Sequence, residues 1–272
     1  MTPETSATDA RTTRSRRLTR VTTGALLAAA LASAAMACSS DDDAASSTTT
    51  GAGGHAHTVS AEACGAFAEL SGLTFAMPED PGAMPAFVEE SMVPVVRTIV
   101  DGLPADHAAP GTTVLDAYSS VARTGSPEAL EDPAVTEAQT EVGEMLFESC
   151  PGTKLEVSGV DYAFEGLPDR VEAGPTLLSF TDDGTEEHEI MVVKRNEGTE
   201  MTLDELLALP GDEAFAQVTP ITVTWGGPGE TSYTAMDLEP GTYFALCNIP
   251  IGGGEDGPPH HTAGMKQTFV VS

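Results

Sequence analysis

The sequence predicts a two-domain α+β protein, in which a small helical bundle pinned by a disulfide precedes an antiparallel β-sandwich. Three observations support this class. Apolar residues recur at helical spacing between residues 58 and 150, and two cysteines bracket this half. Short runs rich in β-branched and aromatic residues fill residues 153–272. The composition changes around Cys150-Pro151-Gly152, which we take as the boundary between the two domains.

Four amphipathic segments predict the helices of the first domain. Ser60 is a candidate N-cap for the first helix, and Pro94 must bend or start the second. The third covers about residues 112–125, and the fourth has the clearest start, with Asp132 as N-cap and Pro133 at its first position. This pattern fits a four-helix bundle, and it contains no constellation of catalytic residues.

The second half changes to the period of β-strands. Gly, Pro and Asp turns separate seven short runs, which predicts an antiparallel sandwich. One helix, in TLDELLALP, interrupts the series. The predicted strands are LEVSGVDYAF, PTLLSFTDD, HEIMVVKR, ITVTW, TSYTAMDL, GTYFALC and KQTFVV.

Residues 1–37 predict an export signal, because an apolar, Ala-rich run too short for a comfortable membrane span follows a group of arginines. The stretch from Ala35 to Cys38 resembles the lipobox of bacterial lipoproteins. That resemblance implies a lipidated (palmitate-type) Cys38 and a protein anchored to the outer face of the cell membrane. A plain secretory signal is the alternative, and Arg16-Arg17 also fits twin-arginine export.

Residues 38–57 predict a lipid-bearing cysteine followed by a disordered tether, since the segment is polar, acidic and small. The whole chain has a formal charge of −30. Five of the twelve basic residues and two of the forty-two acidic ones lie in residues 1–37, so the remainder carries −33. Such a charge argues against nucleic acid as a partner, and a partner steered by electrostatics would be basic.

Four cysteines have to be assigned. With Cys38 lipidated, Cys64 and Cys150 form a natural disulfide across the helical half, in a compartment where disulfides persist. A pairing of either one with Cys247 remains open at this stage. If Cys64 and Cys150 pair, Cys247 is a spare thiol that should be buried or bound.

The segment around Cys247 contains a group of potential metal ligands. In GTYFALC, Tyr243, Ala245 and Cys247 point to one side of a buried strand. His260 and Met265 lie on the loop that follows, and His188 opens an upstream strand. Two imidazoles, a thiolate and a weak axial thioether are the ligand set that favours copper.

These residues resemble the cupredoxins, the blue copper proteins, and most of all the plastocyanin-like ones. Gly241-x-Tyr243-x-x-x-Cys247 matches the strand into the copper loop, and Pro259-His260-x-x-x-Gly264-Met265 matches the far end of that loop. The resemblance covers about residues 153–272 and implies a Greek-key sandwich with a type 1 copper site. It implies His188, Cys247 and His260 as equatorial ligands and Met265 as the axial one, with His261 as a substitute for His260.

The sequence departs from the family in one place. Twelve residues, NIPIGGGEDGPP, separate Cys247 from His260 where very few are usual. The extension costs only about 1.6 kcal/mol of loop-closure free energy, which metal binding easily exceeds. The insert therefore does not forbid the site.

The resulting functional prediction is a lipid-anchored, extracytoplasmic copper protein that carries single electrons to a redox partner. It is not predicted to be an enzyme, although copper oxidase chemistry is a lesser alternative. Two other classes remain open: a metal-free cupredoxin-like binding module, and a copper storage or delivery protein. In the metal-free case His188 is a surface imidazole, and Cys247 and Met265 are core filling.

Overall fold

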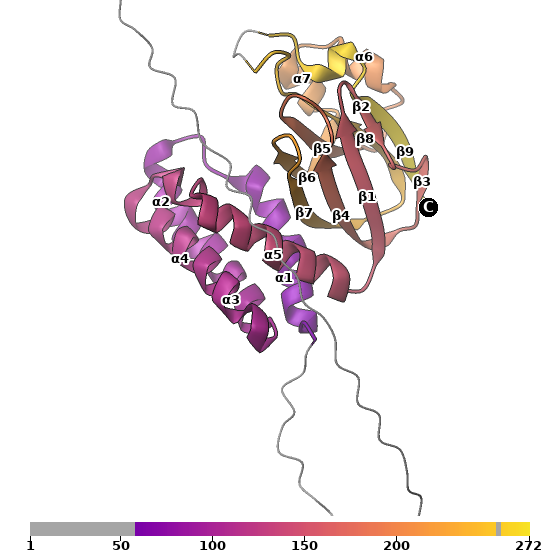
Figure 1. Cartoon of the computed structure of the whole chain (residues 1–272). Coiled ribbons are helices and arrows are strands. Elements are labelled where there is room, and N and C mark those ends of the chain that lie inside the picture. Colours follow the sequence, from indigo (N-terminus) through magenta and orange to yellow (C-terminus); the bar gives the residue numbers. More distant parts are fainter. Residues whose placement is uncertain (1–57, 254–256) are drawn as a thin grey trace, which may run out of the picture. The chain divides into compact units, whose positions relative to one another are not determined.

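The computed structural model describes residues 58–253 and 257–272, and the predicted fold class is confirmed (Figure 1). Residues 1–57, which include the predicted export signal, Cys38 and the predicted tether, lie outside this range. Within the described residues, no helix has the length and apolar character needed to cross a membrane. The helices of the first half are α1 (Ala61–Leu73), α2 (Met84–Phe87), α3 (Val93–Asp101), α4 (Ala108–Thr124) and α5 (Pro133–Ser149).

Short 3₁₀ and π turns join these helices. Both predicted N-caps are confirmed: the Ser60 side chain accepts a hydrogen bond from the amide of Ala63, and Asp132 accepts one from Ala134. The second predicted helix is interrupted, because Pro94 lies in the first turn of α3 and a π turn precedes it. The turns are Thr74–Ala76, Pro81–Ala83, Val88–Met92 (the π turn), Ala105–His107 and Pro127–Leu130.

A disulfide joins Cys64 in α1 to Cys150 at the end of α5, as the sequence predicts. Cys150 is buried in the core of the helical part, beside residues of α1, α3, α4 and α5. The bond therefore ties the first helix to the last across 86 residues of chain. Cys247 is a free, buried cysteine, which resolves the choice of pairing.

The second half is a β-sandwich of two sheets. One sheet has the order β2-β1-β4-β7, and the other has the order β3-β9-β8-β5-β6. The strands are β1 (Thr153–Val160), β2 (Ala163–Glu165), β3 (Arg170–Val171), β4 (Gly174–Asp182), β5 (His188–Arg195), β6 (Val218–Gly226), β7 (Thr231–Leu238), β8 (Gly241–Leu246) and β9 (Lys266–Val271). Three short helices accompany them: α6 (Leu203–Leu207), α7 (Gly211–Phe215) and α8 (His260–Ala263).

The sheets are mixed and not wholly antiparallel, which corrects one detail of the prediction. β1 pairs with β4 in parallel, and β3 pairs with β9 in parallel. The run LEVSGVDYAF breaks at Asp161 and Tyr162 into β1 and the short antiparallel β2. The chain then crosses to β3 in the other sheet, so that it re-enters the first sheet beside β1 in the same direction.

Side chains of β8 alternate between two apolar cores, as the sequence predicts. Tyr243, Ala245 and Cys247 belong to the core between the two sheets. Phe244 and Leu246 face the opposite way and pack against buried leucines of α6. With both faces covered, the strand holds Cys247 in a fixed, dry position at its end.

The helical part packs against the first sheet. Leu177 of β4 and Ala235 of β7 belong to the core formed by the helices. The hydroxyls of Ser71 and Thr234 lie 2.7 Å apart and join α1 to β7. This sheet is therefore apolar on both faces, one toward the second sheet and one toward the helices.

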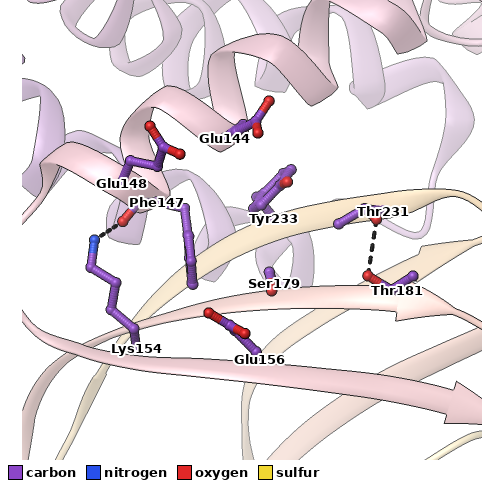
Figure 2. A pocket seen from close by; sticks show the side chains of 9 residues that line it. All are labelled: Glu144, Phe147, Glu148, Lys154, Glu156, Ser179, Thr181, Thr231 and Tyr233. Carbon is purple, nitrogen blue, oxygen red and sulfur yellow. Dashed lines mark hydrogen bonds between the residues drawn. The ribbon is translucent and has the colours of Figure 1, made fainter.

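A shallow hollow of about 450 Å³ lies between α5 and the first sheet (Figure 2). Glu144 and Glu148 of α5 and Glu156 of β1 line it, with the rings of Phe147 and Tyr233. Lys154 donates a hydrogen bond to the Phe147 carbonyl at its edge. Among the described residues, buried side-chain polar atoms without a hydrogen-bond partner occur only at Asp182 and His188, which do not line this hollow. We interpret it as a solvated acidic surface.

Removal of the disulfide should destabilise the protein strongly. The double change Cys64→Ser and Cys150→Ser is expected to lower the free energy of unfolding by about 4–5 kcal/mol, because the unfolded chain regains the entropy of a long closed loop. Urea unfolding followed by circular dichroism measures this change. Cys247→Ser, which leaves the bond intact, is the control, and an equal loss in both proteins contradicts the prediction.

Two glycines test the contact between helices and sheet. A Cβ at Gly143 of α5 would lie 2.8 Å from two Tyr233 side-chain carbons, whereas a Cβ at Gly65 of α1 has open space. Gly65→Ala should therefore stabilise the protein by about 1 kcal/mol through helix propensity. Gly143→Ala should destabilise it by about 1–3 kcal/mol through overpacking. Thermal unfolding of both variants measures the difference, and two stabilised variants would count against the packing.

Candidate metal centre

Three predicted ligand residues meet at one end of the sandwich. His188 is the first residue of β5, Cys247 follows β8, and His260 is the first residue of α8. All three are completely buried, and one ligand atom from each lies within 4.8 Å of the others. His188 lies 59 positions before Cys247 and 72 before His260 in the sequence, yet the three side chains converge on a single point.

The same nitrogen of each imidazole faces the centre of this cluster. Nδ1 of His188 lies 2.9 Å from Nδ1 of His260, which lies 3.5 Å from Sγ of Cys247. Two imidazole lone pairs at this distance repel each other unless a proton or a cation lies between them. The donor set and its geometry therefore fit a metal ion of the copper or zinc type.

Met265 lies directly beside the cluster. It is completely buried, its carbonyl accepts a hydrogen bond from the Cys247 amide, and its amide donates to the His260 carbonyl. A Cβ at Gly159 would meet both the Met265 methyl carbon, at 3.1 Å, and the His188 Cβ, at 3.2 Å. The thioether side chain and His188 thus pack against the same glycine, which fits the predicted role of Met265 as a weak fourth ligand.

His261 does not take part in the cluster. Its Nδ1 lies 3.2 Å from the carbonyl oxygen of Cys247, and burial lowers the pKa of its imidazole. His260 occupies the ligand position, and the predicted substitution by His261 is not needed in this arrangement.

The insert between Cys247 and His260 closes on itself. Pro250 and Pro259 form an isolated antiparallel bridge, and the Ile251 amide donates to the Pro258 carbonyl at 3.0 Å. The His260 amide then donates to the Ile249 carbonyl at 2.9 Å. The bridge therefore brings His260 back next to the strand end, so that the long spacer does not displace it.

The thiol of Cys247 is held in a desolvated position. Burial raises its pKa to about 11, against opposing hydrogen bonds from the Glu189 and Ile249 amides. The Glu189 amide lies 3.4 Å from the sulfur. The metal-free thiol is therefore protonated at neutral pH, and a metal ion has to displace that proton.

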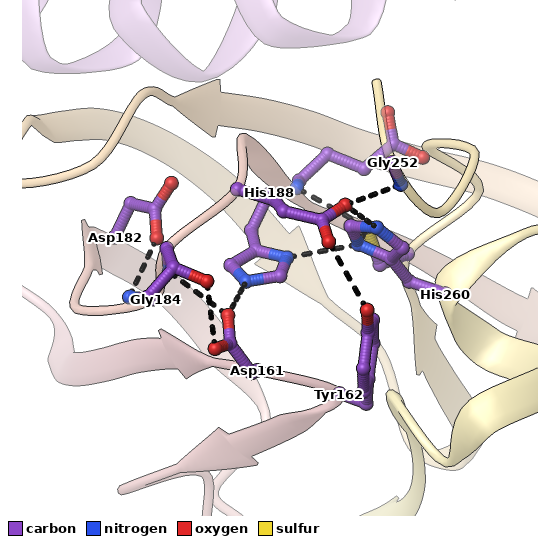
Figure 3. Close-up of polar contacts among 11 residues, drawn as sticks. Asp161, Tyr162, Asp182, Gly184, His188, Gly252 and His260 are labelled. Atoms are coloured by element: carbon purple, nitrogen blue, oxygen red, sulfur yellow. Dashed lines mark hydrogen bonds and ion pairs between the residues drawn. The ribbon is translucent and has the colours of Figure 1, made fainter. Parts of the chain in front are cut away.

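Two carboxylates, which the sequence analysis did not single out, contact the outer nitrogens of the histidines. Nε2 of His188 lies 3.4 Å from Asp161, and Nε2 of His260 lies 3.3 Å from Glu186 (Figure 3). The Thr185 amide, more than His188, lowers the pKa of Asp161, and the Gly252 amide, more than Tyr162 or His260, lowers that of Glu186. The acidic run before His188 was the only available signal, and it is weak in so acidic a chain.

A β-sandwich that gathers two histidines, a cysteine and a methionine at one end has the fold and donor set of the cupredoxins. The resemblance inferred from the sequence is confirmed for the fold and for the donor set, and this donor set is the one that fits a type 1 copper site.

Comparisons with solved structures found several similar chains. The chain is similar to an auracyanin from Roseiflexus castenholzii, with 25% identity, 45% of this chain and 99% of that chain covered, and a TM-score of 0.31. Auracyanin A from Chloroflexus aurantiacus, a blue copper protein, has 20% identity, with 44% and 98% covered and a TM-score of 0.30. A multi-copper oxidase from Pediococcus acidilactici has 14% identity, with 46% and 27% covered and a TM-score of 0.26.

These TM-scores are low, so the assignment rests on the geometry of the cluster and not on the similarity. The sequence matches no protein-family model and no curated protein.

The reactivity of Cys247 tests its environment. At pH 8, iodoacetamide should modify the folded, metal-free protein at least about a hundredfold more slowly than the urea-unfolded protein, because the thiolate fraction is that much smaller. The rate should rise about tenfold per pH unit up to the raised pKa of about 11. Mass spectrometry of the peptide that contains Cys247 measures both rates. Equal rates in the two states would show that the thiol is neither buried nor shifted.

Proposed function

We propose that this protein is a blue copper protein that carries single electrons. The observation that carries the proposal is the completely buried cluster of His188, Cys247 and His260, with Met265 packed beside it. Copper held there would alternate between Cu(I) and Cu(II), which thiolate, thioether and imidazole ligands can both accommodate.

The chain's own residues are suited to that role. Strand ends and backbone hydrogen bonds fix the positions of the three ligand side chains, so little movement is needed between oxidation states. None of the three ligand residues is exposed, which keeps solvent and small substrates away. Within residues 58–253 and 257–272, no other such group of His, Cys, Asp and Glu occurs. These features favour a one-metal carrier over an oxidase.

We further propose that the protein is exported and held on the outer face of the cell membrane by lipid on Cys38. The sequence of residues 1–37, which predicts an export signal and lies outside the described residues, supports this. The disulfide between Cys64 and Cys150 fits an oxidising compartment. The formal charge of −30 supports a basic redox protein as the partner.

Copper delivery is the weaker candidate. A delivery protein has to release its metal readily to a recipient, which is easiest from an exposed site. Complete burial of both histidines and the cysteine opposes that exchange. If the protein does not bind copper, the alternative function is that of a metal-free binding module.

A copper titration tests the proposed function. The chain from residue 38 onward, with Cys38→Ser, should bind one equivalent of Cu(II) and develop an intense blue absorption band with narrow copper hyperfine splitting. Cys247→Ser should lose the band completely, because the band arises from charge transfer between thiolate and copper. Absorption and EPR spectra measure both effects.

His261→Ala is the matched control, since this neighbouring imidazole lies outside the cluster. It should keep the blue band with an unchanged equivalence point. A blue band that survives Cys247→Ser rejects the ligand assignment. Absence of copper binding by the unsubstituted site rejects the carrier function and leaves the metal-free module.

A further inference from the structure

Each imidazole of the cluster meets a carboxylate on its far side. Asp161 approaches Nε2 of His188 at 3.4 Å from the turn after β1, and Glu186 approaches Nε2 of His260 at 3.3 Å from the segment before β5 (Figure 3). Since Nδ1 of both rings faces the cluster centre, a proton on each Nε2 points at a negative charge. The two contacts come from separate segments and serve separate ligands.

Both carboxylates are themselves fixed by hydrogen bonds. Asp161 accepts from the amide and the hydroxyl of Thr185, both at 2.9 Å. Glu186 accepts from the Gly252 amide at 2.6 Å and from the Tyr162 hydroxyl at 3.1 Å. Glu186 thereby connects the His260 side chain to the start of the insert, which explains how that loop stays near the site.

Two backbone positions near these contacts are unusual, one in its close packing and the other in its conformation. A Cβ at Gly184 would lie 2.4 Å from Nε2 of His188 and 2.8 Å from Oδ1 of Asp161, so only glycine leaves room for this pair. Tyr162 adopts a left-handed conformation with φ of 65°, which is uncommon for a bulky residue. Its ring packs edge-on against the His260 ring, with the centroids 5.1 Å apart.

The solvent exposure of the two carboxylates determines how strongly their charges act on a bound metal ion. Nε2 of His188 forms no hydrogen bond within the described residues, so the approach of Asp161 at 3.4 Å is an ion-pair contact, and both His188 and His260 are fully buried. The Asp161 and Glu186 side chains are 43% and 28% exposed, so water screens part of each charge. A moderate effect on the metal is therefore expected, and not the large one of a fully buried charge.

We propose that Asp161 and Glu186 are positioning residues that hold a proton on Nε2 of each histidine, direct both Nδ1 atoms at the copper, and favour Cu(II) over Cu(I). This inference rests on the proposed function. A carboxylate behind a ligating imidazole fixes its tautomer and raises its basicity, which favours the more highly charged ion. The centre should consequently have a lower reduction potential than it would with neutral partners at these two positions.

The experiment replaces each carboxylate by its amide, Asp161→Asn and Glu186→Gln, singly and together, in the chain from residue 38 onward with Cys38→Ser. Each single change should weaken Cu(II) binding by about 10–100-fold. Cu(I) binding should weaken less, and each tenfold preferential loss of Cu(II) raises the potential by about 59 mV. Competition titrations for both ions and redox titration of the blue band measure these changes.

Glu239→Gln is the matched control. Glu239 is an exposed carboxylate that pairs with Lys194 before β8, at the opposite end of the strand from Cys247. The substitution Glu239→Gln removes the same formal charge as Glu186→Gln, at a position that contacts no histidine. Potentials that shift equally in Glu186→Gln and Glu239→Gln would overturn the proposal, because the effect would then be one of net charge.

A zinc-loaded sample provides a readout independent of blue copper. In this redox-silent form, ¹H–¹⁵N NMR should show both Nε2 protons shifted downfield by their carboxylates. Glu186→Gln should move only the His260 signal and Asp161→Asn only the His188 signal. If neither signal moves, the proposal fails. If copper gives no blue band while these shifts occur, the carrier function fails and the pairing stands.

If circular dichroism shows that one amide variant does not fold, the other variant still tests the proposal for the histidine that it contacts, which is His188 for Asp161→Asn and His260 for Glu186→Gln. Glu186→Asp provides a further check, since it keeps the charge and withdraws it from His260 by one methylene. It should move the His260 signal in the same direction as Glu186→Gln. An unchanged His260 signal in a folded Glu186→Asp protein contradicts a positioning role.

Discussion

Backbone hydrogen bonds between the end of β8 and the chain returning from the insert determine the geometry of the centre. The Cys247 amide donates to the Met265 carbonyl, the His261 amide donates to the Cys247 carbonyl, and the His260 amide donates to the Ile249 carbonyl. These bonds depend in turn on β8, whose alternate residues are buried between the sheets and under α6. The ligand geometry is therefore a property of the sheet and not of the metal, which is how a site can be formed before an ion arrives.

Burial and charge oppose each other at this centre. His188, His260, Cys247 and Met265 have no exposed surface, so their polar atoms depend entirely on protein partners. Asp161 and Glu186 provide those partners while remaining partly in water, which avoids the cost of two fully buried carboxylates. The chain as a whole is acidic, with 42 acidic and 12 basic residues. Through the contacts of Asp161 with His188 and of Glu186 with His260, two of these negative charges lie at the edge of the candidate metal centre.

The sequence predicted the elements better than their pairing. Periodicity located the helices and strands, and alternation in GTYFALC placed Cys247 on the inner face, because such patterns depend only on local geometry. The parallel pairing of β1 with β4 depends on a chain crossing between sheets, which no local pattern encodes. The three residues of the cluster were recognisable by type and order. Asp161 and Glu186 were not, because acidic residues are too common in this chain for two of them to stand out, and only the fold brings them to the histidines.

The bridge between Pro250 and Pro259 holds the two ends of the insert together beside His260. The Gly252 amide also ties this segment to Glu186, so a change of length between Gly252 and Pro258 is the one that leaves both this contact and the hydrogen bond from His260 to Ile249 in place. A protein engineer can therefore lengthen the chain between these two residues while His260 keeps its position. A recognition peptide grafted there would join the chain within a few residues of the candidate metal centre.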